Sequence, residues 1–102
     1  MPNVWSSGIW RVKAGREAEF AQAWRAFAEW SAATFGSGHA WLLRDRARPD
    51  ELISIGPWPS DEVVARWRSD PGFAERVARL RELVDSLEPR TLDEVVAIRM
   101  SD

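Results

Sequence analysis

The chain has 102 residues, of which 45% are hydrophobic and 29% are charged, and its formal net charge is −2. This composition predicts one globular domain over residues 1–102 and gives no basic surface of the kind that binds nucleic acid. There is no cysteine, which excludes disulfides and thiolate sites. We also find no apolar run long enough for a membrane span and no signal-peptide pattern, so we expect a cytoplasmic protein with no membrane partner.

Strand and helix patterns alternate along the first half of the chain. Val4–Val12 is rich in β-branched and aromatic residues and predicts a strand. A helix is predicted over Arg16–Thr34, where apolar side chains recur at spacings of three and four, and the Gly36-Ser37-Gly38 segment ends it. His39–Asp45 predicts a second strand.

A hairpin and a sharp strand-to-helix transition follow. Arg48-Pro49-Asp50 has the composition of a turn, and Glu51–Gly56 predicts the third strand. Pro57 and Pro59 hold the residues before them in extended geometry. Ser60 is then predicted to cap a short helix that carries Trp67, because its hydroxyl can accept from a free backbone N–H.

The last third of the chain predicts a longer helix and a final strand. Asp70 is its expected cap and Pro71 its first residue. Arg81 and Asp85 are expected to pair on its exposed side. Its apolar stripe contains Phe73, Val77, Leu80, Val84 and Leu87, and Glu88-Pro89 closes it. Thr91–Met100 is predicted as the fourth strand.

The element order β-α-β-β-α-β is that of an α+β, ferredoxin-like fold with a four-stranded antiparallel sheet. Such a sheet has helices on one face only, yet apolar residues adjoin one another in its strands, as in the pairs Leu42-Leu43, Leu52-Ile53 and Val95-Val96. Neighbouring residues of a strand point to opposite faces. Both faces should therefore be apolar, and we expect a homodimer whose sheets pack face to face.

Two motifs resemble the antibiotic biosynthesis monooxygenase (ABM) domain family. They are GPW-x-S-x-E-x(4)-W over residues 56–67 and V-x-x-G-x-E-x-x-F over residues 12–20. The resemblance implies a dimeric α+β barrel with a ligand pocket between the helices and the sheet. It also implies, for the polyketide-oxidising members, that O2 oxidises a hydroxylated aromatic molecule with no metal, flavin or heme cofactor.

The heme-degrading branch of that family matches less well. Its tryptophan on the second helical segment corresponds to Trp67, but its heme-ligating histidine falls at about Val77 and its first-strand asparagine near Ser7. Two of the three functional residues are therefore absent. We expect no heme oxygenation and no cofactor.

The candidate site residues are mostly aromatic. Trp24 and Phe27 lie on the apolar stripe of the first helix, where they either contact a ligand or fill the core. The resemblance places Trp67 at the pocket. His39 is the only histidine; it is either a general base for a phenolic proton or an exposed residue at a strand start. Arg44 either pairs with a phenolate or carboxylate or is solvated at the strand end.

Three further tryptophans have structural predictions. Trp5 and Trp10 have opposite parity in the first strand and should face opposite sides of the sheet. Trp58, between two prolines, should plug the end of the sheet.

Two functions remain open at this stage. One is a cofactor-independent monooxygenase that oxidises an aromatic, polyketide-like molecule. The other is a non-catalytic dimer that binds an apolar small molecule or has a stress-related role.

Overall fold

A computed structural model describes residues 3–36 and 38–98 of the chain. Its elements follow the order β-α-β-β-α-α-β, in which two short helices together replace the second helix of the ferredoxin-like pattern. They are β1 (Val4–Val12), α1 (Glu17–Phe35), β2 (Trp41–Asp45), β3 (Arg48–Trp58), α2 (Asp61–Ser69), α3 (Pro71–Arg81) and β4 (Val84–Asp93). The predicted fold class is confirmed.

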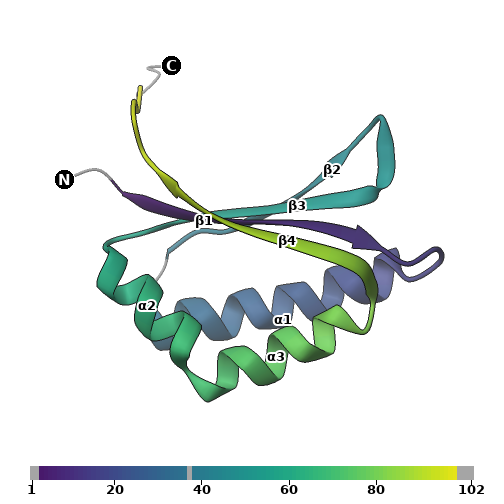
Figure 1. The fold of residues 1–102 in the computed structure, drawn as a ribbon, viewed down its shortest axis with the longest axis horizontal. Coiled ribbons are helices and arrows are strands. Elements are labelled where there is room, and N and C mark those ends of the chain that lie inside the picture. The colour runs from purple at the N-terminus through teal and green to yellow at the C-terminus, as the bar shows by residue number, and fades with distance from the viewer. Residues whose placement is uncertain (1–2, 37, 99–102) are drawn as a thin grey trace.

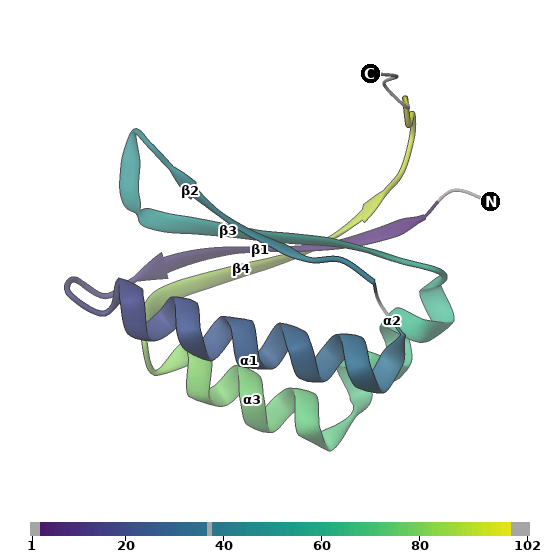
Figure 2. The ribbon, with the colours of Figure 1, turned by 180° about the vertical axis from the view of Figure 1, so that it is seen from behind.

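The four strands form one antiparallel sheet in the order β2-β3-β1-β4. All three helices cover one face, which we call the helix face, and leave the outer face bare (Figures 1 and 2). Trp10 lies on the helix face against Phe20 of α1, with ring centroids 5.1 Å apart, whereas Trp5 stacks on Trp41 on the outer face. The prediction that Trp5 and Trp10 face opposite sides is thus confirmed. No helix in the described ranges is long and apolar enough to span a membrane.

Local signals fix the helix ends as expected. The Ser60 side chain accepts a hydrogen bond from the backbone N–H of Val63, and Asp70 Oδ1 accepts one from Gly72 N at 2.7 Å. Gly36 ends α1 in the left-handed conformation, with φ of 77°, which glycine adopts without steric cost. Ser37, the next residue of the predicted terminator, lies outside the described residues.

The predicted bounds of the last helix and the last strand are wrong. Helix α3 ends at Arg81, and β4 starts at Val84, seven residues before the predicted strand over Thr91–Met100, whose last two residues lie outside the described part. A bulge explains the error. Val12 pairs with Val84 but Arg11 pairs with Ser86, so one extra residue lies between these positions of β4.

The bulge puts two β4 residues three positions apart on the same face. Val84 and Leu87 both face the helices, and their spacing continues the helical stripe that ends at Leu80. The predicted pairing of Arg81 with Asp85 is also wrong, because Asp85 belongs to the strand. Pro89, which was expected to close the helix, lies in β4, an edge strand, where proline is tolerated.

The hairpin between β2 and β3 is tighter than predicted. Residues 46–47 form the turn, and Asp45 Oδ1 accepts a hydrogen bond from Ala47 N at 2.8 Å. Arg48-Pro49-Asp50, predicted as the turn, instead begins β3, which also runs past Gly56 to Trp58. At the other end, β2 begins at Trp41, so His39 precedes the strand.

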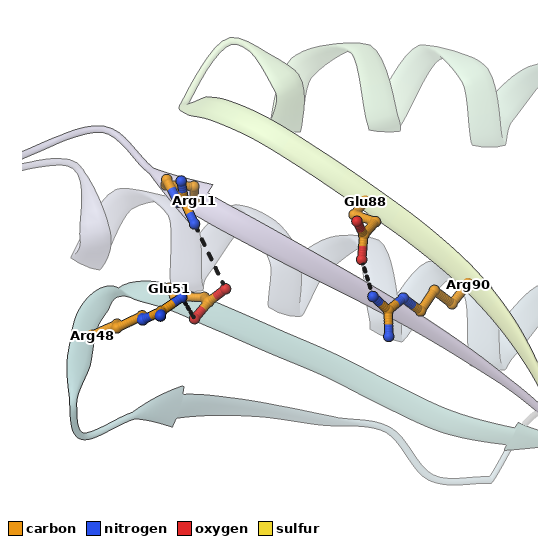
Figure 3. A network of polar contacts seen from close by, with 5 residues as sticks. All are labelled: Arg11, Arg48, Glu51, Glu88 and Arg90. Carbon is orange, nitrogen blue, oxygen red and sulfur yellow. Dashed lines mark hydrogen bonds and ion pairs between the residues drawn. The ribbon is translucent and has the colours of Figure 1, made fainter.

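The outer face of the sheet has an apolar centre and a polar rim. Its centre contains alternate residues of the four strands: Trp5, Ile9, Trp41, Leu43, Ile53, Ile55 and Leu92. Ion pairs lie toward its edges (Figure 3): Glu51 lies 3.9 Å from Arg11 and 4.0 Å from Arg48, and Glu88 contacts Arg90. Leu43 is 52% exposed, so apolar surface faces the solvent here.

Beyond β4, residues 94–98 rise on the side of the sheet away from the helices (Figure 1). Val95 and Val96, predicted to lie in the fourth strand, belong to this segment and are exposed. Their apolar side chains therefore add to the uncovered surface instead of contributing to the two faces of the sheet.

Candidate functional site

Two apolar cavities lie between the sheet and the helices. The first cavity, of about 310 Å³, is bounded by β1 and β4 on one side and by α2 and α3 on the other. The second cavity, of about 280 Å³, lies between α1 and the end of β3, beside residues 38–40. Ser6, Phe27, Ser54 and Trp67 line both cavities. The volumes are near the lower end of the range for small-molecule sites.

Trp67 forms the shared wall. Its side chain is only 8% exposed, and its ring lies 4.5 Å from that of Trp58 and 4.8 Å from that of Phe73, measured between centroids. The indole Nε1–H donates to Ser31 Oγ at 2.9 Å, and Ser31 Oγ donates in turn to the carbonyl of Phe27 at 2.8 Å. Helix α2 therefore supplies the ring, and α1 fixes its orientation through a buried hydrogen bond.

The sheet gives the cavities a floor with ordered hydroxyl groups. Trp10 Nε1 donates to Ser54 Oγ and Trp58 Nε1 donates to Ser6 Oγ, each at 2.9 Å. Gly8 leaves the room that the first pair needs, because a Cβ there would lie 2.9 Å from Trp10 Nε1. Within the described residues every buried side-chain nitrogen and oxygen has a partner. The surface of the floor is thus mostly apolar, but it also presents hydroxyl groups whose orientation is fixed by hydrogen bonds.

The rim of the first cavity is positively charged. Arg68 donates to Thr91 Oγ1 at 2.5 Å and to the carbonyl of Arg90 at 3.4 Å, and its guanidinium lies 5.9 Å from the Trp67 ring centroid. Arg81 also lines the cavity. None of the described residues that line the first cavity is acidic, although acidic residues outnumber basic ones in the chain.

The structure brings four of the five candidate site residues to one place. Trp24, Phe27, Trp67 and His39 all line the second cavity. Arg44 is exposed on β2 and lines neither cavity. The roles assigned to these residues remain predictions.

His39 borders the second cavity with its ring turned elsewhere. Its imidazole stacks on Trp41, with centroids 5.9 Å apart, and Trp41 belongs to the outer face of the sheet. As the structure stands, the imidazole is therefore poorly directed for a general base acting inside the cavity.

Trp58 does more than fill the end of the sheet. It is buried at the end of β3, as predicted, but it also lines the second cavity, contacts the Trp67 ring and orients the Ser6 hydroxyl. Its indole thus connects the end of the sheet to the shared wall.

The positions that correspond to the heme-binding residues of the related branch lie in the first cavity. Both Val77 and Ser7 line it, and neither offers an imidazole to a heme iron. The described residues contain no group of three or more His, Cys, Asp or Glu side chains that could hold a metal ion.

Several lining residues were not found from the sequence. Ser6 and Thr91 are far apart in the chain but pair directly across β1 and β4, so their side chains lie side by side on the helix face. Ser54, which pairs with Gly8 across β1 and β3, was missed for the same reason, whereas Arg68 lies on α2 and was missed because the sequence does not show that this helix packs beside β4. The register of β1 with β4, which would have identified Ser6 and Thr91 as neighbours, was obscured by the misplaced fourth strand.

Comparisons with known proteins agree with this fold. The family model for antibiotic biosynthesis monooxygenase matches residues 9–79. SnoaB from Streptomyces nogalater, a cofactor-independent oxygenase whose structure was solved for a mutant, is 23% identical over 97% of this chain and 95% of its own, with a TM-score of 0.79.

Other solved structures share the fold at lower identity. A protein from Deinococcus radiodurans is 19% identical over 97% of this chain and 99% of its own, with a TM-score of 0.82. A conserved protein from Methanosarcina mazei is 17% identical over 90% of this chain and 92% of its own, with a TM-score of 0.80. A search of curated proteins finds no match. Because the family model covers well over half of its length, the chain belongs to the antibiotic biosynthesis monooxygenase family.

Proposed function

We propose that the protein is a cofactor-independent monooxygenase that oxidises a hydroxylated aromatic, polyketide-like molecule with O2. The observation that carries the proposal is the buried Trp67 ring, which forms a wall of both apolar cavities. An apolar cavity with a few oriented polar groups suits a flat aromatic ligand. Membership of the family and the fold shared with SnoaB support the same reaction class.

The reaction needs little from the protein beyond binding and desolvation. Oxidation of an activated ring CH2 to a carbonyl consumes one O2: one oxygen atom enters the product, and the other leaves as water with the two hydrogens of the CH2. The substrate supplies all the electrons for this change. The cavity walls would hold the ring against Trp67 and exclude water, and the hydroxyls of Ser6 and Ser54 would contact its oxygen atoms.

The working unit would be a homodimer formed through the outer face of the sheet. An apolar centre with a rim of ion pairs is the usual anatomy of a protein interface, and this face has both. The exposed apolar residues Val95, Val96 and Ile98 belong to the segment after β4, which rises on the same side of the sheet (Figure 1). A second copy of the chain would cover this surface.

Oxygen uptake by purified protein, with a panel of hydroxylated anthrones and no added cofactor, tests the proposed reaction, because an anthrone carries the ring CH2 that the reaction oxidises. Uptake should scale with protein concentration and fall at least tenfold in Trp67→Phe. Trp30→Phe is the matched control, because Trp30 lies on α1 next to Phe27 but lines neither cavity. Uptake that is the same in Trp67→Phe and wild type would remove this ring from the site.

The second candidate function is non-catalytic binding of an apolar small molecule. It is favoured by the absence of a carboxylate or imidazole among the residues of ranges 3–36 and 38–98 that line the first cavity. Under this hypothesis the panel compounds quench tryptophan fluorescence saturably while no oxygen is consumed. The two measurements together distinguish the candidates.

A further inference from the structure

Of the three arginines that line the first cavity, Arg90 pairs with Glu88, whereas Arg68 and Arg81 have no counter-ion among the described residues. Arg68 forms hydrogen bonds only to the Thr91 hydroxyl and to the Arg90 carbonyl, and Arg81 has no ion pair within the described residues. Elsewhere in the described chain Arg16, Arg25 and Arg79 each pair with a nearby glutamate. A guanidinium has five N–H donors, so Arg68 keeps several free for a ligand.

Two hydroxyls add to this arrangement. Thr91 Oγ1 accepts from Arg68, and Ser6 Oγ accepts from Trp58 Nε1. Neither hydroxyl donates to an acceptor within the described residues, so the hydrogen of each is available to a ligand. Because Ser6 and Thr91 pair across the strands, their hydroxyls lie together on the helix face. We call Arg68, Thr91 and Ser6 the donor corner.

The donor corner adjoins apolar walls, which limits the chemistry of the ligand. Phe27, Phe73, Val77 and Leu87 line the same cavity. Within the part of the chain that the structure describes, no carboxylate or imidazole lines this cavity to remove a proton from a bound molecule. A neutral acid bound here would find no base to take its proton. A group that is already an anion at neutral pH needs only hydrogen-bond donors, and the cavity supplies these.

We propose that the ligand of the first cavity is an aromatic molecule with a carboxylate substituent, whose ring lies against Trp67 and Phe73 and whose carboxylate binds at the donor corner. Arg68 is the main anchor, because a guanidinium forms paired, charge-assisted hydrogen bonds with a carboxylate. The carboxylate would lie at the rim, where Arg68 is only partly buried. This inference rests on the proposed function only because it takes the first cavity as the ligand site. It narrows the proposed substrates to aromatic molecules that carry a carboxylate.

Tryptophan fluorescence titration with 2-naphthoate and 2-naphthamide tests the inference, since the two probes share a ring and differ in charge. We expect naphthoate to bind about tenfold more tightly, as one charge-assisted hydrogen-bonded contact allows. Arg68→Gln should lower naphthoate affinity to that of the amide and leave amide binding unchanged. Arg66→Gln is the matched control, because Arg66 is an exposed arginine of the same helix that lines neither cavity.

A second variant tests the same contact more gently. Thr91→Val removes the hydroxyl that orients Arg68 and should weaken naphthoate binding severalfold, again without an effect on the amide. Equal affinity for the two probes in the wild-type protein would overturn the inference, as would an equal effect of Arg66→Gln and Arg68→Gln. Failure of both probes to bind would also overturn it.

The test is independent of turnover. Tighter naphthoate binding in a protein that consumes no oxygen would support the anionic ligand and reject the oxygenase. Oxygen uptake that is indifferent to a carboxylate on the substrate would support the oxygenase and reject the donor corner.

Discussion

The hydrogen bond between Trp67 and Ser31 makes a quantitative prediction, because it fixes the wall between the two cavities. Ser31 is 5% exposed, and its hydroxyl accepts from the indole N–H at 2.9 Å. Ser31→Ala leaves that donor buried and unpaired, which costs about 1–3 kcal/mol. Alanine is the better helix former by ~0.5 kcal/mol, which offsets part of the loss. We therefore expect the free energy of unfolding to fall by about 1–2 kcal/mol.

A double-mutant cycle separates this hydrogen bond from other effects of the substitution. Phenylalanine at position 67 has no N–H, so Ser31→Ala in the Trp67→Phe background leaves no donor unpaired. There the same substitution should be neutral or stabilise by ~0.5 kcal/mol. Urea unfolding followed by far-UV circular dichroism measures all four proteins, and equal m-values would validate the comparison.

Two outcomes would refute the reasoning. An equal loss of stability from Ser31→Ala in both backgrounds would show that its cost does not come from the indole. No loss in the wild-type background would show that water from the adjoining cavities satisfies the donor, and the ring would then not be held by α1.

Three other predictions concern the ends of elements and the outer face. Ser60→Ala should lower the free energy of unfolding by about 1 kcal/mol through loss of the cap of α2, and Ser60→Asp should preserve it; equal losses in urea melts would refute the role of the cap. Leu43→Lys places a charge on the exposed apolar centre and should convert a dimer into a monomer in analytical ultracentrifugation; a monomeric wild-type protein at micromolar concentration would reject the interface. The hydrogen bond from Arg16 lowers the pKa of Glu19. The ionised Glu19 therefore contributes stability at pH values above the ordinary glutamate pKa, and this contribution is lost as the pH falls through the lowered pKa. An NMR titration of Glu19 that Arg16→Gln leaves unchanged would contradict this.

Features with local causes were predictable from the sequence. The caps at Ser60 and Asp70 and the left-handed Gly36 depend on residues within a few positions of one another. The long helix has a clear apolar period, and the first strand has the correct bounds. These signals were sufficient for the element order and therefore for the fold class.

The end of α3 and the register of β4 were not predictable in this way. A bulge puts Val84 and Leu87 three positions apart on one face, which is also a helical spacing. Pro89 reads as a helix terminator unless the strand is known to lie at the edge. Periodicity alone cannot separate these cases, because the same spacing fits a continued helix and a bulged strand.

The candidate site shows the same division. Trp24, Phe27 and Trp67 could be selected because they lie on helical stripes and, for Trp67, because of the family motif. The polar groups of the first cavity come from β1, β3, β4, α2 and α3, and only the three-dimensional pairing brings Ser6 next to Thr91. The general-base role considered for His39 also depends on three-dimensional packing that the sequence does not show. In the structure its ring stacks on Trp41 and so turns toward the outer face.

The composition of the cavities also predicts how the rate should depend on pH if the protein is an oxygenase. None of the described residues that line the first cavity carries a carboxylate or an imidazole, so a substrate bound there has to ionise without a protein base; Glu29 and His39 line only the second cavity. The pH profile of kcat/KM should therefore follow the acidity of the substrate, so two anthrones that differ in acidity should give profiles displaced by the same difference. His39→Gln should leave both profiles unchanged, because its ring stacks on Trp41. A common inflection for both substrates that disappears in His39→Gln would instead identify this histidine as the general base, and the cavity would have to rearrange to admit it.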